Sequence, residues 1–519
     1  MRLLLLLSVV VFLASATPGC VQRKFGEVET GSMVCVCNAT YCDEIEPLGN
    51  VDGGTAVIYW TDRDKYRRMD RTVAKFSTVA REKVVRLDTS QLHQEVLGFG
   101  GCFTDSSGIQ FYSLSEKGQE LILKQYFGPT GTEYTLARIP IASTDFGSRI
   151  YSYVDKPGDF NLSTFALQGE DFIYKIPFIK RAMEMQKDNG GIRFFASPWS
   201  APAWMKSNNA MQGGGKLRGF EGGQYYIAWA NYFVKFLEAY TAQGIPIWAI
   251  TVQNEPTSGA DPTYRWQTMY FSAQMERDFI KGQLGPALEA SPAGKNVSII
   301  ILDDQRFLLP AWADIIFEDE YVSSLAPGIG VHWYEDLITP ASALATTHEK
   351  HPNKFILATE ACEGWLDFGR GVLLGDFSRG ESYAHSILED MNNFVGGWID
   401  WDFALDITGG PAWPGDVVDA PIIVDAAKGE FYKQPMYYAM AHFSKFLKPG
   451  ARRASLTMPK FPDQVEAMGA LMVDGRRALF MMNRNSKESI SFSLEDVGRP
   501  GQYLNIDMPA HSIITAVWN

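Results

Sequence analysis

The sequence predicts an α/β protein whose main domain is a (β/α)8 TIM barrel, flanked by all-β structure built from both ends of the chain. Three observations support this. From residue 93 to residue 447, short apolar runs alternate with longer amphipathic stretches, as strands alternate with helices in a parallel barrel. Residues 17–92 and 448–519 instead contain short runs rich in β-branched and aromatic residues. With 519 residues, the chain is also long enough for more than one domain.

The first 16 residues have the pattern of a signal peptide. Met1 and Arg2 precede an apolar run that ends at Ala14, and Ser15 and Ala16 supply small residues for cleavage. The run is shorter than a membrane-spanning helix, and no later stretch is long and apolar enough to span a bilayer. We therefore predict export into the secretory pathway, removal of residues 1–16 and no transmembrane anchor.

The segment 17–92 is predicted to be β-rich and carries four of the six cysteines, Cys20, Cys35, Cys37 and Cys42. Four cysteines allow three pairings, and their positions alone do not choose among them. Two disulfides are favoured over a zinc site because the Cys35-x-Cys37 spacing is tight and the exported compartment is oxidising. The other two cysteines, Cys102 and Cys362, are expected to be free and buried.

Three Asn-x-Ser/Thr triplets begin at Asn38, Asn161 and Asn296 and are predicted surface glycosylation sites in an exported chain. The chain has 47 Lys and Arg against 60 Asp and Glu, which gives a formal net charge of -13. Because a nucleic-acid partner requires a basic face, this balance argues against one. It is compatible with an acidic compartment.

Eight strand-like runs follow one another in the barrel region, mostly separated by helical stretches. They lie at residues 96–103, 134–141, 192–197, 247–252, 297–302, 329–333, 355–359 and 396–399. The predicted helices are 114–126, 171–187, 223–243, 310–317 and 380–393. A doubly wound open sheet is the alternative, but it usually has fewer units, and no complete G-x-G-x-x-G opens a helix here.

A β insertion is expected near residues 403–432, at the end of the barrel domain. Beyond residue 448 the chain returns to short strands at 467–472, 477–482, 489–494 and 512–518. We predict that residues 448–519 complete a β-sandwich with the N-terminal segment.

Two glutamates stand where a barrel enzyme carries its chemistry, at the C-terminal ends of strands. Glu255 follows the fourth run and Glu360 follows the seventh. The ends of these strands face each other across a barrel mouth, so both carboxylates reach one substrate. Glycoside hydrolysis requires two such carboxylates. A single strand-end acid is more often a cap or a salt-bridge partner, but the pair, with Asn254 directly before Glu255, favours catalysis.

Other polar residues near strand ends have less specific interpretations. Asp145, Asp303 and Asp400 follow the second, fifth and eighth runs. Arg138 is expected to neutralise buried carboxylates near Glu360. His332 either shapes the site or is a satisfied inward-facing histidine.

No metal or cofactor is expected. His348 and His351 have a spacing that could bind a metal on a helix, but the charged residues around them favour a solvated helix end.

Several longer motifs resemble the glucosylceramidases of glycoside hydrolase family 30. They are Val34-Cys-Val-Cys-Asn-Ala-Thr-Tyr-Cys-Asp, Gly98-Phe-Gly-Gly, Asn254-Glu-Pro, Leu302-Asp-Asp-Gln-Arg, Val331-His-Trp-Tyr, Glu360-Ala-Cys and Phe431-Tyr-Lys-Gln-Pro-Met. The resemblance runs from about residue 20 to the end of the chain.

The resemblance implies a role for individual residues. Glu255 corresponds to the acid/base and Glu360 to the nucleophile of a retaining β-glucosidase. Tyr334 corresponds to the hydroxyl that hydrogen-bonds the nucleophile. The positions that match glucose contacts are Asp145, Trp199, Asn254 and Trp401. The family pairs its N-terminal cysteines consecutively, which implies Cys20–Cys35 and Cys37–Cys42.

The resemblance also implies hydrolysis of glucosylceramide at a membrane surface, with anionic lipid and a saposin-like activator as partners. It implies a lysosomal location, with secretion as the alternative. Ala412 and Asp402 stand where the family commonly has asparagine, so the preference for the aglycone could differ. The two alternatives are hydrolysis of another β-glucoside or β-1,6-glucan and a catalytically dead sugar-binding protein. Retention of both glutamates argues against the second.

Overall fold

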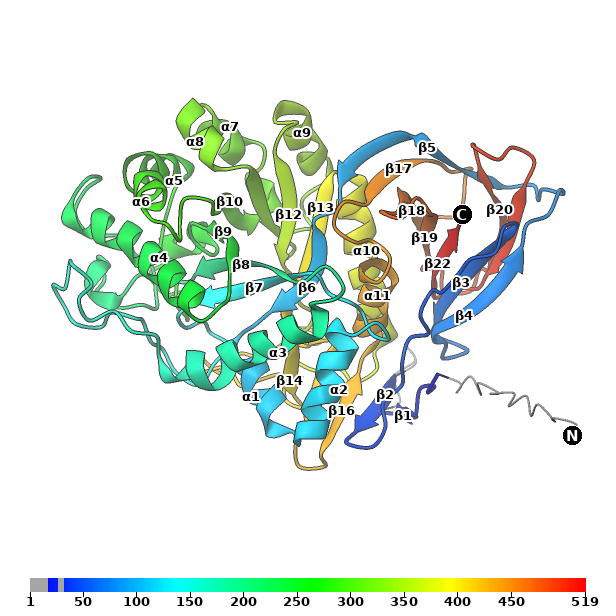
Figure 1. Cartoon of the computed structure of the whole chain (residues 1–519), viewed down its shortest axis with the longest axis horizontal. Coiled ribbons are helices and arrows are strands. Elements are labelled where there is room, and N and C mark those ends of the chain that lie inside the picture. Colours follow the sequence, from blue (N-terminus) through cyan, green and yellow to red (C-terminus); the bar gives the residue numbers. More distant parts are fainter. Residues whose placement is uncertain (1–16, 27–31) are drawn as a thin grey trace, which may run out of the picture.

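The computed structural model describes residues 17–26 and 32–519. The predicted signal peptide, residues 1–16, lies outside the described residues. The described chain forms a closed barrel, a nine-stranded sheet and a five-stranded sheet. Figure 1 places the barrel at the left, the nine-stranded sheet at the right and β1 and β2 of the five-stranded sheet below.

The barrel contains eight parallel strands in chain order. They are β6 (Gly98–Cys102), β7 (Leu136–Ile141), β8 (Arg193–Pro198), β9 (Ile247–Thr251), β10 (Ser298–Gln305), β11 (Gly328–His332), β12 (Phe355–Glu360) and β13 (Val395–Asp402). The barrel closes where β13 pairs with β6 in parallel. The eight predicted runs coincide with these strands, so the TIM barrel is confirmed and the open-sheet alternative is wrong.

Helices connect the strands around the barrel. They include α1 (Asp105–Ser113), α2 (Glu116–Phe127), α3 (Ile176–Gln186), α4 (Gln224–Ala242), α5 (Ala273–Phe279), α6 (Gly285–Ala290), α7 (Ala311–Phe317), α8 (Glu320–Leu325), α9 (Ser342–Lys350) and α10 (Phe377–Asn392). The side chain of Ser115 caps α2 by accepting a hydrogen bond from the backbone N–H of Gly118. The predicted helix 171–187 differs in its first turn, which is a π-helix at Asp171–Lys175.

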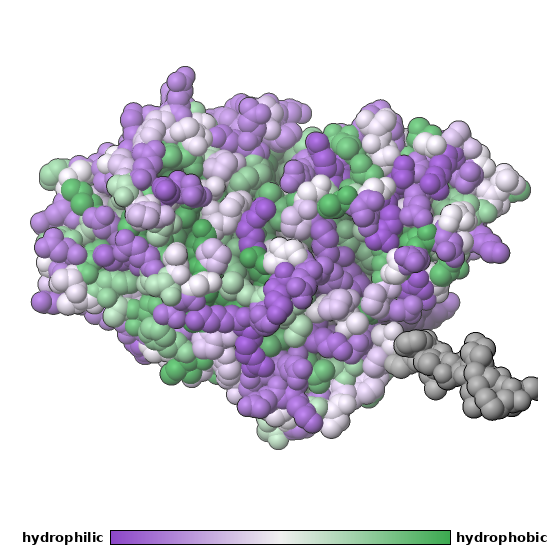
Figure 2. Space-filling model, viewed as in Figure 1, coloured by the Kyte–Doolittle hydropathy of each residue, from purple (hydrophilic) through white to green (hydrophobic). Residues whose placement is uncertain are grey.

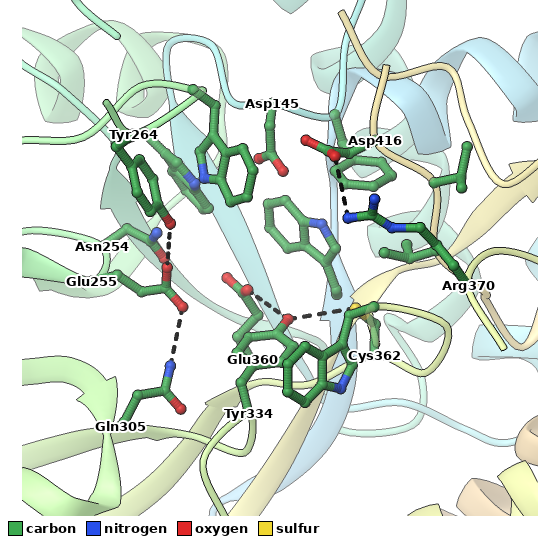
Figure 3. Close-up of a pocket in the computed structure, with 17 residues that line it drawn as sticks. Asp145, Asn254, Glu255, Tyr264, Gln305, Tyr334, Glu360, Cys362, Arg370 and Asp416 are labelled. Atoms are coloured by element: carbon green, nitrogen blue, oxygen red, sulfur yellow. Dashed lines mark hydrogen bonds and ion pairs between the residues drawn. The ribbon is translucent and has the colours of Figure 1, made fainter. Parts of the chain in front are cut away.

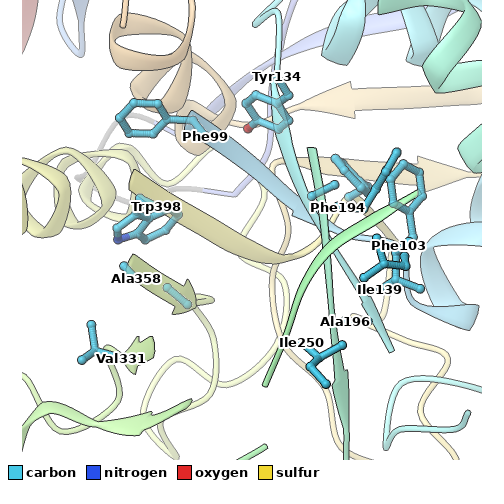
Figure 4. Packing of buried hydrophobic residues seen from close by; sticks show 14 of the residues in the cluster. Phe99, Phe103, Tyr134, Ile139, Phe194, Ala196, Ile250, Val331, Ala358 and Trp398 are labelled. Carbon is cyan, nitrogen blue, oxygen red and sulfur yellow. The ribbon is translucent and has the colours of Figure 1, made fainter. Parts of the chain in front are cut away.

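The alternation of side chains along the strands builds the interior of the barrel in layers. One apolar layer consists of Leu136, Phe195, Ala249, Ile300, Leu357 and Ile399. Two residues further along β7 and β8, the same face carries Arg138 and Ser197. The opposite faces of the strands pack outward against the helices, as Ile139, Phe194 and Ile250 do in Figure 4. The inner face therefore changes from apolar to polar just before the strands end.

The nine-stranded sheet combines both ends of the chain. Its strands from before the barrel are β3 (Thr55–Asp62), β4 (Arg68–Lys75) and β5 (Val84–Glu95). Its strands from after the barrel are β17 (Arg452–Thr457), β18 (Val465–Leu471), β19 (Arg477–Asn483), β20 (Ile490–Asp496), β21 (Tyr503–Met508) and β22 (Ser512–Trp518). The last strand, β22, pairs with β3, and β17 and β20 both pair with β5. The predicted all-β structure from the two ends is thus confirmed.

The five-stranded sheet has a different composition. It consists of β1 (Gln22–Lys24), β2 (Met33–Asn38), β14 (Ala404–Asp406), β15 (Ile422–Asp425) and β16 (Glu430–Lys433). The first two strands therefore pair with the 403–432 insertion, through β2 and β16. The predicted boundary between residues 92 and 93 falls within β5. The exact domain limits remain a prediction.

Two disulfides tie the start of the chain to this sheet, Cys20–Cys35 and Cys37–Cys42, as the family resemblance implied. Cys102 and Cys362 are free and buried, as expected. Within the described residues, no helix is long and apolar enough to cross a membrane. The face in Figure 2 mixes hydrophilic and hydrophobic residues over both the barrel and the nine-stranded sheet.

Candidate active site

The loop after β9 holds Glu255 in a backbone conformation that is rare for its residue type. Its φ of 43° lies in the left-handed region, although a residue before proline prefers an extended backbone. Two contacts fix it: its N–H donates to the carbonyl of Asp303 at 2.9 Å, and its carbonyl accepts from Oγ of Ser258 at 2.7 Å. Such strain at a cavity is typical of a functional residue.

The side chain of Glu255 is oriented by one residue of the loop after β9 and by the last residues of β10 and β11. Its Oε2 accepts a hydrogen bond from the Tyr264 hydroxyl at 3.1 Å, and its Oε1 accepts from Nε2 of Gln305 at 3.2 Å. Nδ1 of His332 lies 3.1 Å from Oε1. Neither Tyr264 nor Gln305 was predicted from the sequence to have a role in the site. The only signal for Gln305 was its place in the Leu302-Asp-Asp-Gln-Arg motif.

Glu360 is the last residue of β12 and is only 6% exposed. Its Oε1 accepts a hydrogen bond from the Tyr334 hydroxyl at 2.8 Å, and its Oε2 accepts from Arg138. One carboxylate oxygen of Glu255, one of Glu360 and one ring nitrogen of His332 all lie within 4.8 Å of one another. The two glutamates therefore face the same small space, as Figure 3 shows.

Arg138 lies beneath this pair and is fully buried. Its guanidinium donates to Glu360, to Oδ2 of Asp303 at 2.7 Å and to Oδ1 of Asn254 at 2.8 Å. The planar fork of an arginine suits three acceptors in fixed directions. The predicted role of Arg138 in neutralising buried carboxylates is confirmed. Burial would raise the pKa of Asp303, but Arg138 and His332 outweigh it and lower that pKa, so Asp303 is an anion.

His332 carries a charge at this site. Its Nε2 lies 3.1 Å from Oδ1 of Asp303. Burial opposes the charge, but Glu360, Asp303 and Glu255 outweigh it and raise the pKa of His332 to about 10. The buried histidine thus shapes the electrostatics of the site.

The pKa of Glu360 reflects the same competition. Burial, with the nearby Glu255, raises the pKa of this carboxyl above its usual value, and the positive charges of His332 and Arg138 and the hydrogen bond from Tyr334 limit the rise without cancelling it. Two fixed cations and one donor therefore favour the carboxylate form in a buried position.

The glutamates open into a cavity of about 240 Å³. Its walls consist of Asp145, Phe146, Trp199, Asn254, Glu255, Tyr264, Trp266, Gln305, Tyr334, Glu360, Cys362, Trp365, Arg370, Trp401, Asp416, Val417 and Val418. All the residues that were predicted to contact a sugar lie in this wall. The rings of Trp199 and Trp401 stack with centroids 5.1 Å apart. A small cavity with aromatic walls and a few convergent polar groups is typical of a small-ligand site.

Several acidic residues at strand ends do not line the cavity. Asp303 lies under its floor against Arg138, and Asp400 accepts from the Tyr383 hydroxyl at 2.9 Å. Asp402 accepts from Thr104 and Ser107, and burial raises its pKa to about 8. These three carboxyls support the structure around the cavity.

The two histidines with metal-like spacing do not converge on one point. His348 stacks on Phe394 with ring centroids 4.0 Å apart, and Nε2 of His351 lies 2.9 Å from Oδ1 of Asp314. Their spacing therefore reflects ring packing and a hydrogen-bond contact with Asp314.

Two family models match the chain. The glycosyl hydrolase family 30 TIM-barrel domain matches residues 96–447, and the family 30 beta sandwich domain matches residues 450–516. The matches cover the barrel and the C-terminal strands of the nine-stranded sheet.

The chain is also similar to full-length proteins. It is 47% identical to "Putative glucosylceramidase 4" of Caenorhabditis elegans, over 96% of this chain and 94% of that one. It is 41% identical to "Lysosomal acid glucosylceramidase" of Mus musculus, over 96% and 95%. Among solved structures, "The endo-beta1,6-glucanase BT3312" has a TM-score of 0.78 and 26% identity, over 90% of this chain and 99% of that one.

Proposed function

Because the chain belongs to glycosyl hydrolase family 30 and is a glycoside hydrolase, we propose that it is a retaining β-glucosidase that hydrolyses glucosylceramide to glucose and ceramide. The separation of the two glutamates carries the mechanistic part of this proposal. Retaining enzymes hold their carboxyls about 5–5.5 Å apart, whereas inverting enzymes leave about 6.5–9.5 Å for a water. One carboxylate oxygen of Glu255 lies within 4.8 Å of one of Glu360, and this short separation fits a retaining enzyme.

The geometry supports one assignment of roles. Glu360, held as an anion by Arg138 and His332, attacks C1 of the glucose while Glu255 donates a proton to the departing oxygen. The C1–O bond to the aglycone breaks and the bond from Glu360 to C1 forms. Glu255 then takes a proton from water, and the water oxygen displaces Glu360 from C1. Glucose leaves with its original β configuration, and both glutamates return to their starting forms.

The substrate contacts in this proposal follow from the cavity wall. Trp199 and Trp401 offer apolar ring surface to the sugar, and Asp145 and Asn254 offer oxygen and nitrogen atoms to its hydroxyls. Tyr334 keeps its hydroxyl on Oε1 of Glu360, which orients the nucleophile. These groups position C1 over the carboxylate.

The surroundings of the cavity favour an apolar aglycone. A second cavity of about 690 Å³ shares Trp365 with the first. Its lining includes Leu337, Leu366, Phe368 and Leu373 beside polar groups. Leu337 is 84% exposed and Phe368 is 79% exposed, which is unusual for large apolar side chains beside a cavity. A ceramide leaving the cavity toward these residues would find apolar surface.

The proposed setting is the lumen of an acidic compartment in the secretory pathway, the lysosome, where the substrate lies in a membrane. Anionic lipid and a saposin-like activator are the proposed partners, since the glucosyl bond of a membrane lipid has to reach a buried cavity. Asn38, Asn161 and Asn296 are the proposed glycosylation sites, and Asn161 and Asn296 are exposed.

A second candidate is the hydrolysis of a β-1,6-glucan. It rests on the similarity to the glucanase structure, which covers most of the chain. The apolar surface around Phe368 favours the lipid substrate, because a glucan chain needs polar partners along its length.

The proposal is tested with purified protein, fluorescent glucosylceramide in anionic vesicles at acidic pH, and a parallel assay on β-1,6-glucan. We expect release of ceramide by the wild type, β-glucose as the first anomer seen by NMR, and loss of both in Glu360→Gln. Cleavage of the glucan but not of the lipid would replace the substrate. An α-anomer as first product would refute the retaining mechanism.

A further inference from the structure

One wall of the active-site cavity comes from a loop that is hydrogen-bonded to a second loop. The β8 loop, residues 206–217, and the β9 loop, residues 259–270, run side by side and exchange backbone hydrogen bonds. The N–H of Gly213 donates to the carbonyl of Trp266 at 3.2 Å, and the N–H of Gly215 donates to that of Gly259 at 2.9 Å. Tyr264 and Trp266 of the β9 loop line the cavity.

A buried lysine lies at the junction of these loops. Lys206 has 0% of its surface exposed. Its Nζ donates to the backbone carbonyls of Met211 at 2.8 Å and Gly213 at 3.0 Å within the β8 loop, and of Thr268 at 2.6 Å in the β9 loop. A buried lysine is normally paired with a carboxylate. For Lys206, three backbone carbonyl oxygens accept the hydrogen bonds that a carboxylate would normally accept.

No charged group accounts for the acidity of this ammonium. Burial is the sole cause that lowers the pKa of Lys206, to about 7. The ammonium form has three N–H donors for its three carbonyls, whereas the neutral amine has two. Loss of the proton from Lys206 therefore leaves one buried carbonyl oxygen without a hydrogen-bond donor. A buried acceptor without a donor costs free energy.

A short path of hydrogen bonds joins this junction to Glu255. The hydroxyl of Thr268 lies 2.6 Å from that of Ser258, and Ser258 donates to the carbonyl of Glu255 at 2.7 Å. The β9 loop also supplies Tyr264, whose hydroxyl donates to Oε2 of Glu255. The loop thus holds both the backbone and the carboxylate of this residue.

The same loop reaches the opposite side of the cavity. Nε2 of Gln267 donates to Oγ of Ser143 and to the carbonyl of Thr144, both at 2.9 Å. Asp145, a cavity residue, follows directly. A shift of the β9 loop would therefore displace Glu255 and Asp145 together.

We propose that Lys206 is a positioning residue for Glu255: its ammonium fastens the β8 loop to the β9 loop, and loss of its proton loosens this wall and lowers activity. The proposal rests on the proposed function in that Glu255 is the acid/base. It predicts a loss of activity on the alkaline side that does not come from Glu255 itself.

The test separates these two titrations by the choice of substrate. A dinitrophenyl β-glucoside has a leaving group that needs no proton, so its cleavage from the enzyme does not depend on the acid form of Glu255. The wild type is expected to lose kcat/KM on this substrate as the pH rises through about 7, the pKa of Lys206. In Lys206→Met we expect kcat/KM to be between about tenfold and 100-fold lower at acidic pH, with the alkaline decline absent.

Lys354→Met is the matched control. Lys354 also donates to backbone carbonyls, those of Ser323 and Ala326, and burial alone lowers its pKa, but it lies outside the cavity wall. We expect the pH profile of kcat/KM for Lys354→Met to follow that of the wild type. An alkaline decline that persists unchanged in Lys206→Met, or activity within about twofold of the wild type, would overturn the proposal.

Hydrogen exchange of the wild type tests the inference without a variant, in case Lys206→Met does not fold. After correction for the intrinsic rate, residues 206–217 and 259–270 should lose protection between about pH 5.5 and about pH 8.5, while α10 does not. If the protection of the two loops were the same at both pH values, the proposal would be overturned. If the wild type cleaved no β-glucoside while the loops still lost protection, the proposed function would fail and the role of Lys206 in fastening the loops would stand.

Discussion

Replacing Arg138 by methionine tests the charge balance under the active site. Methionine has a similar length but no charge, so Glu360, Asp303 and Asn254 lose their shared donor. Both Arg138 and Asp303 have 0% of their side chains exposed, so solvent does not screen the loss. Removing one partner of a buried ion pair costs about 3–5 kcal/mol, because the other charge stays buried and unpaired.

The expected loss of thermal stability follows from this energy. Large domains lose about 2 °C in Tm for each kcal/mol, so Arg138→Met should melt roughly 6–10 °C below the wild type. Adding Asp303→Asn removes one of the orphaned charges and should recover part of the loss. The two variants share a contact, so their effects should not be additive.

The assay is differential scanning fluorimetry at neutral pH, with Arg149→Met as the control. Arg149 forms an ion pair with Glu170 at the surface, with 48% of its side chain exposed, and exposed pairs contribute about 0–1 kcal/mol. Its Tm should stay within about 2 °C of the wild type. If Arg138→Met melted as the control does, or if Asp303→Asn gave no recovery, the account of the buried network would be refuted.

Two further predictions concern pH. Tyr334→Phe removes the hydroxyl that donates to Glu360 and so raises the pKa of that carboxyl; the acidic limb of kcat/KM should move to higher pH, with roughly tenfold less activity at about pH 4. Tyr383→Phe, which removes a buried hydroxyl outside the cavity, should leave the limb in place, and the same shift in both variants would contradict the assignment. Burial raises the pKa of Glu276 from 4.5 to about 8, so the folded chain keeps a proton that the unfolded chain releases. The stability from this group is full below pH 4.5 and is lost as the pH rises through about 8. Glu276→Gln should therefore show a smaller fall in Tm over that range, and a fall equal to that of the wild type would contradict the reasoning.

The barrel strands could be predicted because their signal is local. A strand buried on both faces is a short apolar run, and the helix that follows shows its own period. Glu360 could be singled out because it directly follows such a run, and Glu255 because it lies three residues beyond one. The pairing of β3 with β22 was predictable only in outline, since two β-rich ends imply a shared sheet but not its register.

The pairing of β1 and β2 with the insertion was not predictable from local sequence. Strand segments of three to six residues carry little information about their partner, and the partner β16 lies almost 400 positions further along. The same holds for Tyr264, whose sequence neighbourhood resembles that of many loop residues.

The sequence by itself determined the kind of barrel, and it predicted the two glutamates at the strand ends and the export signal, because these depend on patterns within a few consecutive residues. The sequence predicted that Arg138 neutralises carboxylates near Glu360, but only the tertiary structure decided the full set of charges that meet. Arg138 contacts Glu360, Asp303 and Asn254 because three strands end at one level of the barrel, and His332 is charged because three carboxylates surround it. Lys206 is a further case, since its three acceptors come from two loops. Burial and mutual distance set the protonation of these groups, and both arise only when distant segments pack together.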